Sequence, residues 1–398
     1  MAESTQVRRW RQLLIPQTAG ALESADSALE SIVLEDDPLD RLARARQAMQ
    51  RVVKDRFGGD EALLKAVENL ALTGEEAISV LDSAASEPTD DQFASLEAIV
   101  AFDGTRPSFL VRQQRIDFTS SFNTASWKED LNAYLGQLEQ QIACVGRVEL
   151  GDTHIGTAFL VTPTLAITNR HVAQSIAGIG DGKMQIKANV FLDFGREEWD
   201  ARTSFDRRKV EALVFAGKDP IANPIDHRKF DIGIIRVSAS ELAGDQGKRH
   251  LPLGNATRAA VAAAGIVTTI GYPGAAEFFV PTKLQTQYEK VLARLLEGDG
   301  GAKRFAPGKP VGTDGVAGLG DWTIMHDATT INGNSGSPVG MLQDNAALPF
   351  VTVGLHYGGA WGGDRVNWAH LLGAAGAATG YGTTTTFAEF CAAEGIAL

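Results

Sequence analysis

Three short motifs beyond residue 165 carry side chains that could together perform nucleophilic catalysis. One contains His171 in the string TNRHV, one contains Asp231 directly before the apolar run IGIIRV, and one contains Ser335 in GNSGSP. A serine hydroxyl is a weak nucleophile, so it needs a neighbouring base, and that base needs an acid that fixes its tautomer. The motifs therefore predict Ser335 as the nucleophile, His171 as the general base and Asp231 as the acid that orients it.

Gly333 lies two residues before this serine, and glycine adopts backbone conformations that other residues avoid. A turn at Gly333 would let its own N–H and that of Ser335 point at one spot, where they could stabilise the oxyanion of a tetrahedral intermediate. We therefore expect Gly333 and Ser335 to form an oxyanion hole.

Other interpretations of these residues are weaker. Asp219 and Asp226 could also serve as the acid, but neither opens an apolar run as Asp231 does. GNSGS lacks the second glycine of the α/β-hydrolase elbow, whose histidine follows the serine. The seven histidines and two cysteines show no metal-binding spacing, so we expect no metal or cofactor. The run 178–183 resembles a phosphate loop but precedes Met184 rather than Ser or Thr, which favours a surface turn.

The sequence around the motifs favours strands. From Val145 onward, apolar runs such as VGRVEL, GTAFLVT, LAITN and FVTVGLHY are separated by Gly, Pro and Asn, and 37 of the 42 glycines follow residue 125. Such spacing is typical of an all-β barrel or sandwich. A helical segment over 283–296 interrupts the pattern, and a helix capped by Thr386 closes the chain.

The part before residue 125 carries helix start and stop signals instead. Asp37-Pro38 can open a helix that Gly58-Gly59 would end, and Asp60 can cap the next one. Thr73 with Glu76, and Thr89 with Gln92, match the capping box. These signals predict a small helical bundle.

A transition joins the two parts. Residues 106–112 indicate a short strand after a turn, and residues 118–125 a loop. Ser126 with Glu129 forms a further capping box, which predicts one helix that carries Leu131, Leu135, Leu138 and Ile142 on one face. We therefore expect a helical domain over 1–103, a linker strand and connecting helix over 104–141, and a catalytic domain over 142–398.

Taken alone, His171 could be a core histidine and Asp231 an ordinary acid at a strand end, but the conjunction of three motifs is specific. The order His, Asp, Ser, with separations of 60 and 104 residues in a β-rich domain, resembles the chymotrypsin-like (trypsin-fold) serine peptidases. The resemblance covers roughly residues 142–398. It implies an all-β double β-barrel and, with the helices, a multidomain protein that also ends in a C-terminal helix.

The resemblance also suggests which residues line the substrate pocket. Thr329 stands where trypsin-like enzymes carry the acid that selects Arg or Lys, so a basic preference is disfavoured. Thr330 and His356, with Gly358 beyond them, resemble segments of the bacterial glutamyl endopeptidases, and such a pair could donate hydrogen bonds to a substrate carboxylate. Simple packing of His356 on its strand is the alternative.

Regulation is expected from the front of the chain. Asn334 replaces the aspartate through which pancreatic-type zymogens are activated, so activation by a freed amino terminus is not expected. The linker pattern RPSFLVRQQRIDF and the stretch KRFAPG are similar to those of bacterial trypsin-like proteins with effector-associated helical domains. That similarity implies a protein partner, or self-association, through residues 1–103.

Charge and cysteine usage limit the setting. The net charge is −12, and the first hundred residues hold 10 basic and 19 acidic residues, which argues against binding of nucleic acid or an anionic membrane. The acidic front is typical of a solvated outer face, with a basic partner as the alternative. Two cysteines give no disulfide framework, and the first twenty residues lack the apolar core of a signal peptide, so we expect a cytoplasmic protein.

The sequence thus predicts an intracellular bacterial serine endopeptidase that hydrolyses a protein substrate and is regulated by its helical domain. The alternative hypothesis is a catalytically silent trypsin-fold scaffold or adaptor that acts through that domain.

Overall fold

The computed structural model describes most of the chain. The described residues are 5–15, 37–83, 86–120, 125–180, 183–197, 206–222, 225–242, 249–274, 287–297, 301–313, 318–330, 333–342, 350–360 and 366–398. Within these ranges, no helix combines the length and the apolar character needed to cross a membrane.

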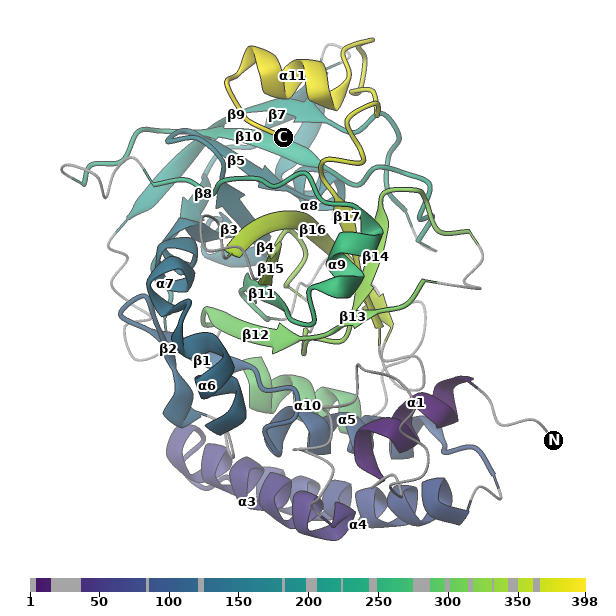
Figure 1. The fold of residues 1–398 in the computed structure, drawn as a ribbon. Coiled ribbons are helices and arrows are strands. Elements are labelled where there is room, and N and C mark those ends of the chain that lie inside the picture. Colours follow the sequence, from purple (N-terminus) through teal and green to yellow (C-terminus); the bar gives the residue numbers. More distant parts are fainter. Residues whose placement is uncertain are drawn as a thin grey trace.

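A helical unit forms the front of the chain (Figure 1). Its helices are α1 (Thr5–Leu14), α3 (Pro38–Arg56), α4 (Glu61–Ser83) and α5 (Asp90–Phe102). Their apolar faces share one core, and α10 (Gln287–Glu297) contributes four buried side chains to it: Val291, Leu292, Leu295 and Leu296. The core of the helical unit is therefore completed by a segment encoded far along the chain.

Local capping explains where most of these helices begin. The Asp37 side chain accepts the N–H of Leu39, and the reciprocal capping box of Thr89 and Gln92 is present. The prediction of a helix start at Thr73 is wrong, because α4 runs unbroken through this position. There the Thr73 hydroxyl contacts the Tyr288 hydroxyl at 3.3 Å, so packing against α10 replaces the cap.

The transition holds two strands and two helices. They are β1 (Phe109–Arg112), β2 (Arg115–Asp117), α6 (Ala125–Asn132) and α7 (Leu135–Cys144), with a short 3₁₀ turn, η2 (Phe118–Ser120), between strands and helices. The single helix predicted from Ser126 is wrong, since it breaks at residues 133–134. Leu131, Leu138 and Ile142 are nevertheless buried in one core.

Six strands close a first barrel in the order β10-β5-β4-β3-β8-β9. They are β3 (Val145–Leu150), β4 (Thr153–Leu160), β5 (Leu165–Thr168), β8 (Val190–Asp193), β9 (Arg207–Ala216) and β10 (Gly233–Val237). Helix α8 (Arg170–Ile176) follows β5, and a hairpin of β6 (Ala177–Gly180) and β7 (Lys183–Ile186) follows α8. Gly178 and Lys183 lie in this hairpin, as the expected surface turn requires, while residues 181–182 are outside the described residues.

A second sheet has the order β13-β14-β17-β16-β15-β11-β12-β1-β2. Its strands from the β-rich part are β11 (Val267–Gly271), β12 (Arg304–Gly308), β13 (Pro310–Val311), β14 (Thr323–His326), β15 (Pro338–Leu342), β16 (Phe350–Ala360) and β17 (Val366–Leu371). Strands β13 and β12 stand at opposite ends of a run of seven strands in this order, yet only Lys309 separates them in the sequence. The sheet must therefore curl so that its two ends come close together. Helices α9 (Arg258–Ala263) and α11 (Phe387–Ala393) complete the unit.

The predicted fold class is confirmed: N-terminal helices precede a β-rich trypsin-like unit that contains a barrel and ends in a helix. Capping of α11 by Thr386 is also confirmed.

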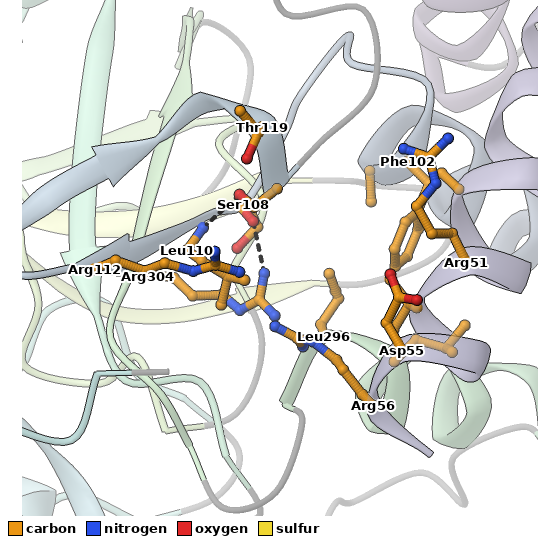
Figure 2. Close-up of a pocket in the computed structure, with 15 residues that line it drawn as sticks. Arg51, Asp55, Arg56, Phe102, Ser108, Leu110, Arg112, Thr119, Leu296 and Arg304 are labelled. Atoms are coloured by element: carbon orange, nitrogen blue, oxygen red, sulfur yellow. Dashed lines mark hydrogen bonds between the residues drawn. The ribbon is translucent and has the colours of Figure 1, made fainter. Parts of the chain in front are cut away.

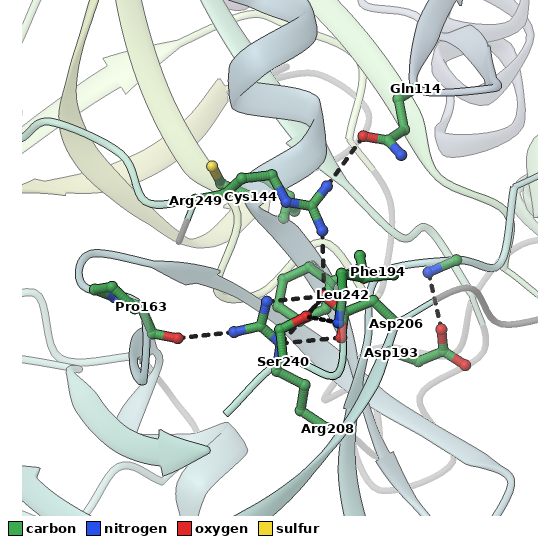
Figure 3. Close-up of polar contacts among 12 residues, drawn as sticks. Gln114, Cys144, Pro163, Asp193, Phe194, Asp206, Arg208, Ser240, Leu242 and Arg249 are labelled. Atoms are coloured by element: carbon green, nitrogen blue, oxygen red, sulfur yellow. Dashed lines mark hydrogen bonds and ion pairs between the residues drawn. The ribbon is translucent and has the colours of Figure 1, made fainter. Parts of the chain in front are cut away.

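Contacts also tie the linker hairpin to the first barrel (Figure 3). Arg249 donates to Gln114 in the β1–β2 turn at 3.1 Å and to Asp206 at 3.2 Å. Asp206 in turn pairs with Arg208, whose second donor reaches the Pro163 carbonyl at 2.7 Å. The linker is therefore part of the folded body.

Candidate active site

Helix α8 presents His171 one turn after the end of β5. Asn169 precedes the helix, and its side-chain amide donates to the Asp231 carbonyl oxygen at 2.9 Å. This bond joins the start of α8 to the segment before β10. His171 is only 6% exposed, so its imidazole is held in a defined orientation.

Asp231 contacts His171 twice. One carboxylate oxygen accepts the His171 backbone N–H at 3.0 Å, and the other lies 2.6 Å from His171 Nδ1. Burial by itself raises the pKa of the Asp231 carboxyl, but the charge of His171 and its hydrogen bonds outweigh burial, and the pKa is lowered. An ionised Asp231 fixes the proton on Nδ1, which leaves Nε2 as the basic nitrogen.

The alternative acids lie elsewhere. Asp219 is exposed, and Asp226 forms an ion pair with Arg228 at 2.9 Å. Asp231 is the carboxylate that the fold brings to His171, as its position before an apolar strand had indicated.

The loop that carries Ser335 is held between β4 and β16. The Ser335 carbonyl oxygen accepts the Thr157 N–H at 2.8 Å, and the Gly336 N–H donates to the His356 carbonyl at 3.0 Å. The Thr157 hydroxyl also donates to the Gly333 carbonyl at 3.0 Å. Thr157 therefore anchors the loop at Gly333 and at Ser335, a role that no motif in the sequence revealed.

Two glycines shape this loop. Gly333 has φ +89° and Gly336 has φ +92°, both in the region that favours glycine. A Cβ on Gly333 would lie 2.6 Å from the Tyr272 carbonyl oxygen, so a side chain does not fit. Among the described residues, neither the Gly333 N–H nor the Ser335 N–H finds an acceptor.

The loop that carries Ser335 and helix α8 both pack against Gly156. A Cβ on Gly156 would lie 3.1 Å from the Ser335 carbonyl oxygen and 2.7 Å from the side chain of Val172, the neighbour of His171. The half-buried Ser335 therefore sits beside the helix that carries the histidine. The fold therefore joins Asp231 to His171 and places the Ser335 loop against the helix that carries His171.

His370 lies behind Asp231. Its Nε2 accepts the Asp231 backbone N–H at 3.0 Å, and its ring stacks on Tyr357 with centroids 4.1 Å apart. Burial lowers the pKa of His370 to about 3, so the imidazole stays neutral and able to accept. Nothing in the sequence singled out His370.

Of the residues expected at the specificity pocket, Thr329, Thr330 and His356 are buried, and Gly358 is half-buried. The Thr330 hydroxyl donates to Asn367, whose amide donates to the Ala328 carbonyl at 2.7 Å. Thr329 is 8% exposed, and its hydroxyl donates to the Arg106 carbonyl at 2.6 Å. Residues 331 and 332 of the same segment lie outside the described residues.

On the opposite strand, His356 packs against His326. Their rings meet edge to face with centroids 5.6 Å apart, and burial lowers the pKa of His326 to about 4 and that of His356 well below its ordinary value. Within the described part of the chain, His356 Nδ1 and both ring nitrogens of His326 have no hydrogen-bond partner. Gly358 follows at a bulge in β16, where a Cβ would lie 3.0 Å from Ile225.

Across the described ranges, no group of three His, Cys, Asp or Glu side chains could hold a metal ion. Cys144 and Cys391 are buried and unpaired, and burial raises the pKa of each thiol to about 12, which makes both unreactive.

A buried His–Asp pair and a glycine-flanked serine in a β-rich unit are the kinds of residue that serine peptidases use. Residues 156–346 match the family model of the trypsin-like peptidase domain. The chain is 29% identical over 294 residues to a probable serine protease of Lysobacter enzymogenes. This alignment covers 68% of this chain and 71% of the Lysobacter protein. A solved structure of mouse neuropsin, a serine protease, aligns with 59% of this chain and 91% of its own at 16% identity and a TM-score of 0.38. The family match and the Lysobacter relative support a trypsin-fold serine peptidase.

Proposed function

We propose that this chain is a serine endopeptidase that cleaves peptide bonds of a protein substrate through Ser335, His171 and Asp231. The observation that carries the proposal is the pair of contacts between Asp231 and His171, at 2.6 Å and 3.0 Å, next to the Ser335 loop. A carboxylate that fixes both the backbone and the ring of a histidine leaves the far ring nitrogen as a base of defined direction.

In the proposed reaction, the Ser335 hydroxyl oxygen attacks the carbonyl carbon while His171 Nε2 takes the hydroxyl proton. The N–H groups of Gly333 and Ser335 stabilise the resulting oxyanion. His171 then gives its proton to the departing amine as the C–N bond breaks. Water repeats these steps on the acyl-enzyme and releases the acid, and no cofactor enters the reaction.

The proposed specificity is for an acidic side chain at the cleavage site. It is supported by two buried imidazoles, those of His326 and His356, with ring nitrogens that lack a protein partner among the described residues. A bound carboxylate would supply acceptors for such groups and favour protonation of an imidazole. Cleavage of a peptide library scanned at this position tests the idea, and a preference for Arg, Phe or Leu over Glu would contradict it.

The proposed regulator is the helical unit, acting through the linker. Support comes from Arg106, four residues beyond the end of α5: its carbonyl accepts the Thr329 hydroxyl, and its guanidinium pairs with Asp327. Asp327 and Thr329 belong to the segment that leads to Ser335. A partner bound to residues 1–103 could therefore alter the loop through the linker.

Replacement of Ser335 by alanine tests the proposed function. Wild-type protein should cleave peptides and react with a fluorophosphonate probe, whereas the Ser335→Ala variant should do neither. Ser337→Ala is the matched control, because its hydroxyl lies two residues away in the same loop. Peptide cleavage that survives in Ser335→Ala would refute the proposal, and wild-type protein that never reacts, with or without partners, would favour the silent scaffold.

A further inference from the structure

A cavity of about 230 Å³ lies where the helical unit meets the second sheet (Figure 2). Helices α3, α5 and α10 form one wall, and β1, η2 and β12 form the other. The cavity lies apart from the residues proposed for catalysis, and nothing in the proposed reaction uses it.

The lining of this cavity is strongly cationic. Four of its fifteen residues are arginines, and Asp55 supplies the single carboxylate among them; the arginines are Arg51, Arg56, Arg112 and Arg304. The whole chain, by contrast, has 37 basic and 49 acidic residues among 398. The lining thus has the opposite sign of charge to the acidic protein as a whole, and this favours binding of an anion in the cavity.

The arginines come from both walls. Arg51 and Arg56 extend from α3, while Arg112 and Arg304 lie on the strand side of the cavity (Figure 2). Arg304 donates to the Ser108 carbonyl at 2.7 Å, and Arg112 pairs with Asp117 at 3.0 Å. A guanidinium has five N–H donors in a planar fork, so it can hold a protein acceptor and still bind a phosphate oxygen.

The remaining lining has an apolar and a hydroxyl part. Phe102, Leu110, Leu295 and Leu296 offer apolar contacts, and hydroxyls from Ser108, Thr119 and Ser120 lie on the strand side. Ligand pockets usually measure roughly 300–1,000 Å³, so this one suits a compact molecule. We propose that it binds a small phosphate-bearing metabolite and couples its binding to the Ser335 loop.

The coupling has a short structural route. Arg304 on β12 is the register partner of Gly271 on β11. A Cβ on Gly271 would lie 2.0 Å from Ser337 Oγ and 2.5 Å from Asn334 Oδ1, so Gly271 packs directly against the residues that flank Ser335. A ligand that draws Arg304 toward the cavity therefore acts on a strand adjacent to the strand that supports the nucleophile loop.

Isothermal titration calorimetry of the full-length chain at constant ionic strength tests the site, with pyrophosphate, AMP and hexaglutamate as separate probes. We expect saturable binding of pyrophosphate or AMP, weakened about tenfold in Arg56→Ala, since one charge-assisted contact is lost. Arg46→Ala is the matched control, because Arg46 also lies on α3 but pairs with Glu68 outside the cavity.

Comparison of the three probes identifies the class of ligand that the cavity binds. Tighter binding of AMP indicates an organic phosphate, and equal binding of both phosphates indicates that the phosphate group is what the site recognises. Absence of saturable binding by either probe, equal affinity in Arg56→Ala, or tighter binding of hexaglutamate would overturn the proposal, the last in favour of an acidic protein segment.

The biological role of the coupling rests on the proposed function, but the coupling itself can be measured without catalysis. Hydrogen exchange provides that measurement. Saturating AMP or pyrophosphate should change exchange in peptides that cover residues 333–342, and Arg56→Ala should require about tenfold more ligand for the same change. Unchanged exchange in a ligand-saturated protein would overturn the coupling. A protein that binds phosphate but never reacts with fluorophosphonate would overturn the proposed function alone.

Discussion

Arg106 and Asp327 form a buried bidentate ion pair across 221 residues of sequence, with both N–O distances at 2.8 Å. Asp327 also accepts the Lys309 N–H at 2.7 Å. Burial raises the pKa of the Asp327 carboxyl, but the Arg106 charge outweighs burial and the pKa is lowered. The pair fixes the chain just beyond α5 to the segment that leads to the Ser335 loop.

Asp327→Asn should destabilise the protein strongly. It leaves the Arg106 charge buried without its carboxylate, and breaking such a pair typically costs about 3–5 kcal/mol. Chemical unfolding followed by circular dichroism measures the loss. Glu68→Gln is the control, because its pair with Arg46 is exposed and worth at most about 1 kcal/mol. Equal losses in the two variants would contradict the importance of the buried pair.

The buried histidines should make the protein sensitive to mild acid. Burial lowers the pKa of His154 and His370 to about 3 and that of His326 to about 4, from an ordinary value of about 6.5. Below that value the unfolded chain binds protons that the folded protein does not, so stability falls as the pH drops. Each histidine contributes roughly 1.4 kcal/mol per pH unit between 6.5 and its folded pKa.

Unfolding free energies measured from pH 7.5 to pH 4.5 test this expectation. His326→Phe should flatten the slope by the contribution of one proton, because phenylalanine keeps an aromatic ring in the buried site. A slope that is the same in this variant would show that His326 is not buried in its neutral form.

His370→Ala should slow the reaction without disturbing substrate binding. The Asp231 N–H loses its acceptor, at about 1–3 kcal/mol, so kcat and the fluorophosphonate labelling rate should fall about tenfold with little change in KM. His370→Gln should recover part of the rate, because its amide oxygen can accept the same bond.

The matched control is His227→Ala. His227 also contacts Tyr357, at 2.8 Å from its hydroxyl, but has no bond to Asp231. If His227→Ala slows the reaction as much as His370→Ala does, the effect comes from the aromatic packing and not from the position of Asp231.

Gly333→Ala should abolish labelling of Ser335 while the protein stays folded. Its Cβ would displace the loop and the Gly333 N–H with it, and loss of one oxyanion donor costs about 10²–10³ in kcat. Gly151→Ala separates this effect from backbone strain, since Gly151 also has positive φ, at +63°, but open space around its Cβ position. Labelling at the wild-type rate in Gly333→Ala would remove Gly333 from the oxyanion hole.

Sequence patterns predicted what depends on neighbours along the chain. The caps of Asp37, Thr89 and Thr386 form as their spacing indicates, because a cap needs only the next three residues. The Thr73 signal failed, since the helix continues through Gly74, where even a Cβ would lie only 3.2 Å from Ile99 and Leu42. Tertiary packing overrode the local preference.

The candidate site divides in the same way. His171, Asp231 and Ser335 stand in recognisable strings, so the sequence alone could propose them as one site, and the His171–Asp231 contact is present. Thr157 and His370 act on them through bonds that cross from one strand or segment to another, and neither residue carries a local signal of that role. The pairing of β1 with β12 is equally non-local, and it is what brings the linker to the second sheet.

The place of α10 limits how this protein can be divided or recombined. Its four buried apolar side chains complete the helical core, and each would lose about 1.5–3 kcal/mol if left in water. Residues 1–103 grafted onto another protease would thus lack the part of their core that α10 supplies. The rest of the chain would expose the apolar face of α10 to water. We therefore expect the helical unit and the β-rich unit to be exchanged only together, because neither is complete without the other.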